Sequence, residues 1–307
     1  MIVFVNPNAA GGAALSKWKK MERFLLDSRI PFSTRLLDGR RSALQLACDA
    51  FRKDERNFVA AGGDGTVNYL MNALIEGSAC MPLENIRFGA IGLGSSNDFH
   101  KPFQPEQAYG GIPFKIDFDR ACARDVGHIA YRDKDALVSR YFLVNASIGV
   151  TAKANDFFNN PDRVLKSLKR FHTASAIFYA AFKTIASHEN LKAVVQSPEI
   201  GTIETELSNL GIAKSPHFSG SLRFNHSAEY DNGRFMVHLF NGMGRKGLLA
   251  LLNRLSHGNL PANARSWSTS ALTLTANKPF AVEFDGEVIH TTEAHFSILP
   301  RYIKVCP

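Results

Sequence analysis

Residues 58–68 read Phe-Val-Ala-Ala-Gly-Gly-Asp-Gly-Thr-Val-Asn, an apolar run that passes into a loop of small residues. The run 58–61 is typical of a short buried strand, and the apolar spacing over 67–75 predicts a helix. Paired glycines between a strand and a helix let the backbone adopt positive φ and approach a phosphate closely. The stretch therefore predicts a phosphate-binding turn at the carboxyl end of a parallel strand.

The acidic residue in this loop indicates a cation as well as a phosphate. A carboxylate beside phosphate oxygens is unfavourable unless a cation lies between them, so Asp64 is expected to bind Mg²⁺ or to orient a reacting group. The Thr66 hydroxyl can donate to a phosphate oxygen, and the dipole of a helix starting near Val67 favours an anion. The alternative is a tight turn in which Asp64 only caps the helix.

Two further loops of small residues follow strand-like segments. Residues 6–12 read Asn-Pro-Asn-Ala-Ala-Gly-Gly, and residues 92–98 read Gly-Leu-Gly-Ser-Ser-Asn-Asp. Taken alone, the second could be an ordinary turn with Asx capping, because it lacks the third glycine of a dinucleotide fingerprint. Since the carboxyl ends of parallel strands meet at one edge of a sheet, we expect all three loops to lie together. The other predicted elements here are strands over 2–5, 32–37 and 87–91 and helices over 15–26 and 42–52.

The remainder of the chain changes character. Short strand-like runs separated by Gly, Asn and Asp turns are typical of an all-β sandwich or barrel. Strands are predicted over 116–118, 141–144, 193–195, 220–223, 234–239, 272–275 and 281–284, and helices over 161–187 and 247–255. Proline and paired glycines within 102–115 mark a boundary between an α/β domain and a β domain.

Composition limits the class of protein. The 307 residues suffice for two domains, and 45% hydrophobic with 21% charged residues excludes a disordered chain. A net charge of +8 favours anionic partners, but the basic residues form no nucleic-acid module, so nucleic acid is not expected. The 23 phenylalanines are candidates for lining an acyl-chain cleft. The sequence has no C-x-x-C pair that would suggest a zinc site, and the apolar stretch 174–182 is too short for a membrane span.

Four ordered motifs carry a resemblance to a known family. They are Asn6-Pro7 with its loop, residues 62–68, Gly94-Ser95-Ser96-Asn97-Asp98-Phe99, and Asp285-Gly286-Glu287, which taken alone would be a hairpin turn. In this order the chain resembles the diacylglycerol kinase catalytic-domain family. That family includes sphingosine and ceramide kinases and the bacterial YegS-like and DgkB-like lipid kinases.

The resemblance implies an architecture. It implies a doubly wound α/β nucleotide-binding domain over 1–115, completed by the tail 296–307, and a β-sandwich lipid-substrate domain over 116–295, with the active site in the cleft between them. It implies ATP and Mg²⁺ as cofactors, Asp64 serving Mg²⁺·ATP, Glu287 as general base and Asp285 as its close partner in catalysis. The expected nucleotide contacts are Asn6, Gly62, Gly63, Asp64, Gly65, Thr66, Asn68, Gly94, Ser95, Asn97 and Asp98.

The chain departs from the family pattern at several positions. Tyr69 stands where Glu is usual, Ser95 replaces the threonine of P-x-G-T, and Leu37 replaces a threonine after the second strand. Bacterial members can carry a structural Mg²⁺ at a D-D-G or N-D-G turn; the corresponding turn here has Asp231 followed by Asn232 at the key acid position.

Three functions remain open at this point. The first is an ATP- and Mg²⁺-dependent lipid kinase that phosphorylates a hydroxyl of diacylglycerol or a related lipid, in phospholipid biosynthesis. The second is a small-molecule kinase similar to NAD kinase, which shares the G-G-D-G-T loop. The third is a catalytically weak regulator that binds lipid or nucleotide. A cytoplasmic location is expected, and a homodimer and peripheral contact with an anionic membrane are open. The contact would be made by a basic helix, for which the alternative is an ordinary solvated face over a core stripe. Its basic residues are Arg163, Lys166, Lys169, Arg170 and His172.

Overall fold

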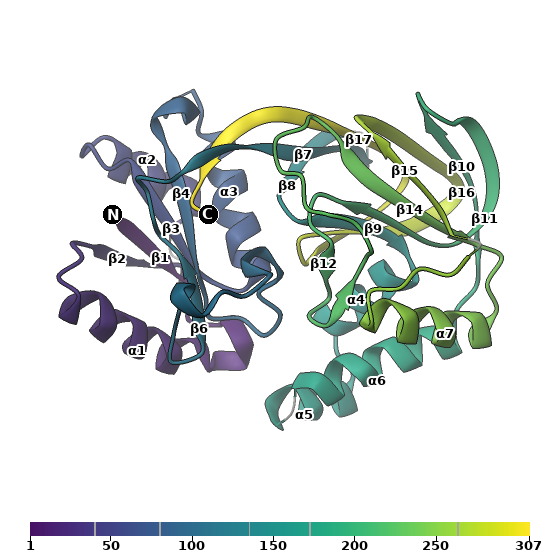
Figure 1. The fold of residues 1–307 in the computed structure, drawn as a ribbon, viewed down its shortest axis with the longest axis horizontal. Helices are drawn as coiled ribbons and strands as arrows, with labels where there is room; N and C mark the ends of the chain where they lie inside the picture. Colours follow the sequence, from purple (N-terminus) through teal and green to yellow (C-terminus); the bar gives the residue numbers. More distant parts are fainter. Residues whose placement is uncertain (40, 80, 135, 172, 263) are drawn as a thin grey trace. The chain divides into compact units, whose positions relative to one another are not determined.

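In the computed structural model, which describes residues 1–39, 41–79, 81–134, 136–171, 173–262 and 264–307, the chain divides into two units. Unit 1 comprises residues 1–126 and 300–307, and unit 2 comprises residues 127–299. Both chain termini therefore belong to unit 1 (Figure 1). His172, named above in the basic helix, lies outside the described residues.

Unit 1 is built on a parallel sheet. Its strands follow the order β2–β1–β3–β4, and the last residues of β17 add a further parallel partner to β4. The bounds are β1 (Ile2–Val5), β2 (Ser33–Leu36), β3 (Asn57–Gly62), β4 (Arg87–Gly92) and β17 (Glu287–Val305). The hairpin of β5 (Ala108–Tyr109) and β6 (Ile112–Lys115) pairs with β4 in the antiparallel sense. The sequence predicted a strand over 116–118, which is wrong, because the nearest strand, β6, ends at Lys115.

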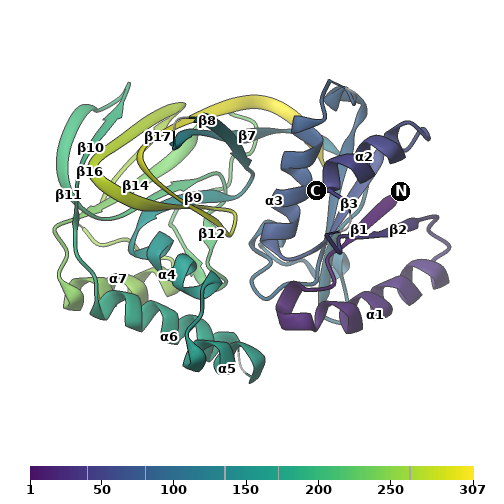
Figure 2. The same ribbon diagram turned by 180° about the vertical axis from the view of Figure 1, so that it is seen from behind.

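Helices cover this sheet because strand side chains alternate between two apolar faces. Helix α1 (Ala14–Asp27) buries Trp18, Met21 and Leu25 against the face that carries Val3 and Val59. On the opposite face the rings of Phe4 and Phe58 stack. Helix α2 (Ala43–Phe51) starts with a capping box at Ser42 and contacts α3 (Asp64–Glu76) (Figure 2). The 3₁₀ helices are η1 (Ala9–Gly12), η2 (Leu83–Asn85), η3 (Asp98–His100) and η4 (Pro105–Gln107).

Unit 2 is largely β structure. Antiparallel strands run in the order β15–β14–β11–β10–β16–β17; β9 bridges β11 and β16, while β7 pairs with β8 and β17. The strands are β7 (Cys122–Asp133), β8 (Ala136–Phe142), β9 (Asn145–Gly149), β10 (Leu191–Ser197), β11 (Gly201–Ala213), β12 (His217–Phe218), β13 (Leu222–Arg223), β14 (Phe235–Asn241), β15 (Arg265–Thr269) and β16 (Ala271–Phe284). The chain is thus a mixed α/β N-terminal region followed by a largely β region.

Four helices lie within the described part of unit 2. They are α4 (Val150–Asn159), α5 (Arg163–Phe171), α6 (Thr173–Ala186) and α7 (Arg245–Ser256). The sequence predicted helix over 161–187 and 247–255 but missed α4. Among the described residues, every helix falls short of the length and apolar character that a membrane span requires.

Most phenylalanines serve packing. The fully buried side chains include Phe4, Phe58 and Phe88 in unit 1 and Phe142, Phe235, Phe240, Phe284 and Phe296 in unit 2. Phe103, Phe178 and Phe182 are more than half exposed. The abundance of phenylalanine therefore reflects two cores more than an acyl-chain cleft.

Candidate functional site

The three small-residue loops of unit 1 lie together, as their positions after parallel strands predict. The amide groups of Leu93 and Gly94 both donate to the Gly62 carbonyl, at 2.8 and 3.1 Å. The Asn6 Nδ2 donates to the Thr66 hydroxyl at 3.0 Å. These bonds join the loops after β1, β3 and β4 into one surface.

Two glycines are needed for this close approach. A Cβ on Gly94 would lie 2.4 Å from the Gly63 Cα, and a Cβ on Gly62 would lie 2.2 Å from the Thr66 Oγ1. Real Cβ atoms do not occur at such distances, so side chains here would force the loops apart. The two glycines therefore allow the loops after β3 and β4 to pack directly against each other.

The helix after the first glycine loop starts earlier than predicted. Helix α3 begins at Asp64 with Gly63 as its N-cap, so the predicted start near Val67 is wrong. The first backbone N–H groups of α3, which have no carbonyl one turn earlier, therefore belong to the G-G-D-G-T motif itself. Asp64 is not a simple helix cap: its Oδ1 accepts the Phe99 N–H at 3.0 Å and so ties this loop to η3.

The predicted nucleotide contacts separate into accessible and buried groups. Gly63, Asp64, Gly65 and Asn6 are half-buried, and Ser95 is exposed. Those that are buried are Gly62, Thr66, Asn68, Gly94, Asn97 and Asp98. Only the accessible group can meet a ligand without rearrangement of the loops.

The buried polar members of the set hold the loops in shape. Asn97, at φ 50°, accepts the Gly94 N–H on its Oδ1 at 3.0 Å and donates to the Gly92 and Gly94 carbonyls, which is the Asx-type closure considered from sequence. Asp98 forms an ion pair with Lys101 at 2.6 Å. Asn68 accepts the amide of Asn72, one turn later in α3. These contacts indicate that Asn97, Asp98 and Asn68 have a structural role.

Sequence reasoning missed a cation at this surface. Lys17 of α1 donates from Nζ to the carbonyls of Leu93 and Gly94, at 3.2 and 3.1 Å. Burial lowers the pKa of Lys17 from its usual value. The only sequence signal is a lysine one turn into the helix that follows residues 6–12, which is common on solvated helices.

In unit 2, the Asp285-Gly286-Glu287 motif is a tight hairpin between β16 and β17. Asp285 and Gly286 have φ of 46° and 92°, the left-handed pair of a two-residue turn. Asp285 is 4% exposed as a residue, and its carboxylate accepts three backbone N–H groups, from Leu143 at 2.6 Å and from Val144 and Asn145 at 3.0 Å. Asp285 thus fixes the β8–β9 turn and is a positioning residue.

The neighbouring carboxylates differ sharply. Glu283 is buried and accepts the Ser147 hydroxyl at 2.7 Å and the Gly286 N–H at 2.9 Å. Glu287, by contrast, is exposed, and within the described ranges no hydrogen bond or ion pair engages its carboxylate. The surrounding protein still removes enough water to raise the pKa of Glu287, while Arg140 acts in the opposite direction. Glu287 therefore keeps its acceptor capacity for a ligand.

The turn that was expected to bind a structural Mg²⁺ contacts the ammonium group of Lys214 instead. The Lys214 ammonium donates hydrogen bonds to Asn232 Oδ1 at 3.0 Å and to the Arg234 carbonyl at 2.6 Å. In the part of the chain that the structure describes, no cluster of three or more His, Cys, Asp or Glu side chains is placed to hold a metal ion. These contacts do not fit Asp231 and Asn232 as ligands of a divalent cation.

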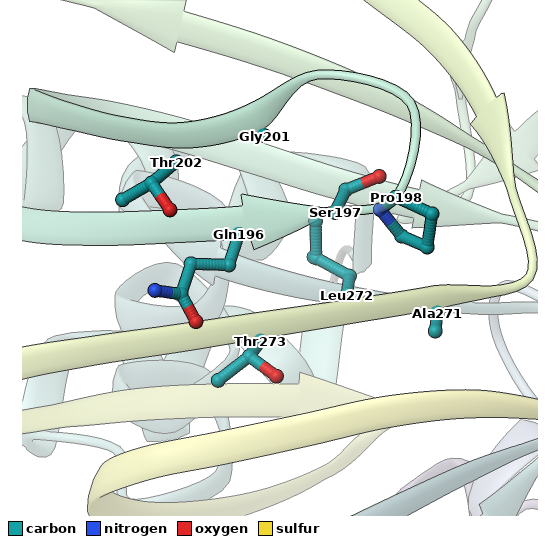
Figure 3. Close-up of a pocket in the computed structure, with 8 residues that line it drawn as sticks. All are labelled: Gln196, Ser197, Pro198, Gly201, Thr202, Ala271, Leu272 and Thr273. Atoms are coloured by element: carbon teal, nitrogen blue, oxygen red, sulfur yellow. The ribbon is translucent and has the colours of Figure 1, made fainter.

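A surface depression in unit 2 lies apart from these motifs. It is at the β10–β11 hairpin and the start of β16 (Figure 3). Its lining residues are Gln196, Ser197, Pro198, Gly201, Thr202, Ala271, Leu272 and Thr273. None of them is a predicted site residue.

In the comparisons with known proteins, a family match covers the part of the chain that contains the three loops of unit 1. Residues 1–123 match the sequence profile described as "Diacylglycerol kinase catalytic domain". Proteins named diacylglycerol kinase are 25% identical to the chain: one from Staphylococcus haemolyticus over 84% of this chain and 72% of its own length, and one from Staphylococcus epidermidis over 80% and 72%.

Solved structures support the fold over the whole chain. A crystal structure from Bacillus anthracis str. Sterne superposes with a TM-score of 0.70 at 16% identity, covering 99% of this chain and 94% of that chain. A second, of a diacylglycerol kinase from the same strain, gives 0.65 at 15% identity, with 99% and 95% covered. The N-terminal 123 residues thus belong to the diacylglycerol kinase catalytic domain family, and the chain is a distant homologue of bacterial diacylglycerol kinases.

Proposed function

We propose that the chain transfers the γ-phosphoryl group of ATP to a hydroxyl of diacylglycerol or a related lipid. The observation that carries this proposal is the contrast within one hairpin. Asp285 accepts three backbone N–H groups, whereas among the described residues none forms a hydrogen bond or ion pair with the Glu287 carboxylate, and its pKa is raised. A carboxylate of that kind suits the deprotonation of an alcohol.

The loops of unit 1 supply the nucleotide site in this proposal. The N–H groups at the start of α3 and the half-buried backbone of Gly63 receive phosphate oxygens. Lys17 adds positive charge beside the same loop. Asp64, half-buried at the loop surface, is the hard oxygen ligand that Mg²⁺ bound with ATP requires, so the residues present fit that ion. When bound, Mg²⁺ neutralises charge on the phosphates.

Glu287 performs the proton step. Its carboxylate accepts the proton of the lipid hydroxyl as the hydroxyl oxygen bonds to the γ-phosphorus, and the bond from that phosphorus to the β–γ bridging oxygen breaks to release ADP. Asp285 keeps the hairpin and the β8–β9 turn in register while this happens.

The direct test is transfer of label from γ-labelled ATP. Diacylglycerol, sphingosine, ceramide and NAD are offered separately to the purified chain. We expect label in a lipid product and none in NAD. Transfer to NAD alone would favour the NAD kinase alternative, and binding of ATP without turnover on any acceptor would favour the regulator.

The Lys17→Met variant is expected to raise KM for ATP by ~10-fold or more with a smaller effect on kcat, because a hydrogen bond from a charged group to phosphate is worth about 1.5–3 kcal/mol. Lys20→Met, an exposed lysine of the same helix, is the matched control. Steady-state kinetics with varied ATP measure both; equal KM values for the two variants would remove Lys17 from the nucleotide site.

Contact with an anionic bilayer is the second part of the proposal. Phe178 and Phe182 lie one turn apart on α6 and are 66% and 56% exposed, and Val164 of α5 is 52% exposed. The exposed cations Arg163 and Lys166 belong to the same pair of contacting helices. Apolar side chains beside cations complement a membrane that carries anionic headgroups.

Replacing Phe178 and Phe182 together by Ser is expected to weaken binding to vesicles of phosphatidylglycerol and phosphatidylcholine by ~10-fold or more, since each phenylalanine side chain contributes about 1.5–3 kcal/mol when fully buried. Leu137→Ser, at 69% exposure on β8, is the control. Vesicle co-sedimentation measures the partitioning, and a second series at high salt tests the charge contribution. Undiminished partitioning of the double variant would contradict the assignment of α6 to the membrane.

A further inference from the structure

Lys214 is the first residue after β11 and carries a charge into the interior of unit 2. The residue is only 2% exposed, and its ammonium lies against the turn formed by residues 231–234. It donates to Asn232 Oδ1 at 3.0 Å and to the Arg234 carbonyl at 2.6 Å. Burying an ammonium is costly unless oxygen atoms accept its hydrogen bonds, and this turn supplies them.

The turn is shaped around that ammonium. Asn232 Oδ1 also accepts the Arg234 N–H at 3.0 Å, which is the Asx-type closure of the turn. The Asn232 Nδ2 donates to Glu229, so the amide oxygen faces the lysine and not the acid. Amide and carbonyl oxygens therefore converge on a single positive charge.

A divalent cation does not fit the same place. Mg²⁺ demands near-octahedral oxygen ligands at about 2.0–2.1 Å and favours carboxylates. Here an amide stands at the acid position, and two of the oxygens accept hydrogen bonds from Lys214. A metal ion would have to displace the ammonium or bind beside a like charge.

The backbone of Lys214 leads from this turn to the Asp285–Glu287 hairpin. The N–H groups of Lys214 and Ser215 both donate to the Val144 carbonyl, at 3.0 and 3.1 Å. The Val144 N–H donates to Asp285 Oδ1 at 3.0 Å. Three steps therefore connect the turn to Asp285: the Lys214 ammonium to the turn, the Lys214 N–H to Val144, and the Val144 N–H to Asp285. Glu287, the candidate base, follows Asp285 by two residues along the chain.

We propose that the Lys214 ammonium takes the place of a divalent cation in the 231–234 turn and, through Val144 and Asp285, positions Glu287 without a metal ion. The positioning half of this statement rests on the proposed function. The metal-independent half stands on the contacts of Lys214 alone.

Thermal unfolding tests the first half without any activity. We expect the wild-type melting temperature to be the same in EDTA and in millimolar Mg²⁺, and Lys214→Met to lower it by about 5 °C or more relative to Lys192→Met, an exposed lysine of β10. Asn232→Asp, which restores an acid but keeps the lysine, is expected to gain no stabilisation from Mg²⁺. Loss of wild-type stability in EDTA, Mg²⁺ stabilisation of Asn232→Asp, or a Lys214→Met variant as stable as its control would each overturn it.

Kinetics well below the melting temperature test the second half. Lys214→Met is expected to lower kcat by ~10-fold or more while KM for ATP stays unchanged, because the base is displaced but the loops of unit 1 are intact. Asn232→Ala, which removes one acceptor, is expected to do the same more weakly if Lys214→Met does not fold. A wild-type protein with no kinase activity would refute the proposed function but leave the melting results readable. Unchanged kcat in a destabilised variant would refute the positioning role alone.

Discussion

Replacement of Glu287 by Gln is expected to lower kcat for phosphoryl transfer by ~10²–10⁴-fold, the range that a positioned general base contributes. The amide has the size of the carboxylate but cannot accept a proton at neutral pH. Folding should be unaffected, because Glu287 is exposed and no hydrogen bond or ion pair within the described ranges depends on it.

Steady-state kinetics and thermal unfolding of the same preparation separate catalysis from stability. Glu204→Gln, an exposed glutamate of β11, is the matched control and should retain wild-type kcat. A Glu287→Gln variant with full turnover would remove Glu287 from the proton step, whatever its stability.

The pH dependence of kcat/KM provides a second view of the same residue. The base must be ionised to accept a proton, so activity rises with pH through its pKa. Because partial burial raises the pKa of Glu287, with Arg140 opposing, the acid limb is expected above the usual range for glutamate. A wild-type acid limb at an ordinary glutamate pKa would contradict this environment.

The Asp285→Asn variant is expected to lose about 3–5 kcal/mol of unfolding free energy, with the melting temperature lower by about 10 °C. The asparagine replaces an acceptor of three backbone N–H groups by one oxygen and an amide that repels donors. The Leu143 N–H then faces the new NH2 group and stays buried without an acceptor, which is among the larger single-residue costs.

Thermal or urea unfolding measures this loss, with Asp133→Asn, an exposed aspartate at the end of β7, as the control. The two carboxylates of the hairpin should thus behave oppositely: Glu287 affects turnover without stability, and Asp285 affects stability first. Equal stability of Asp285→Asn and its control would show that the three N–H bonds contribute nothing.

Strong local patterns made much of unit 1 predictable. The predicted strand over 2–5 is β1, and the predicted helix over 42–52 is α2, where Ser42 and Gln45 form a capping box. The start of α3 was missed by three residues because glycines and an aspartate score poorly as helix formers, while their use at an N-terminus depends on tertiary contacts. In unit 2 the predicted strands over 272–275 and 281–284 are both parts of β16. The stretch Ala-Asn-Lys-Pro at 276–279, with two polar residues and a proline, hides the continuity of the strand.

The site was predictable at the level of motifs and not of roles. The three loops of unit 1 lie together as expected, because parallel topology dictates it. Which side chains face outward was not predictable. The polar groups of Asn97 and Asp285 could bind a ligand, but they form hydrogen bonds with the protein backbone instead. Lys17 and Lys214 come from segments without a motif, and only folding brings their ammonium groups to the loop and the turn.

Transfer of the γ-phosphate of ATP into a lipid decides whether the chain is a lipid kinase. A lipid extract is incubated with the protein and ATP whose γ-phosphate carries an isotopic label, and the lipids are analysed by mass spectrometry, with Glu287→Gln in parallel. We expect a labelled lipid phosphate with the wild-type chain and its loss with the variant. No labelled lipid from the wild type, or equal label from both, would contradict it.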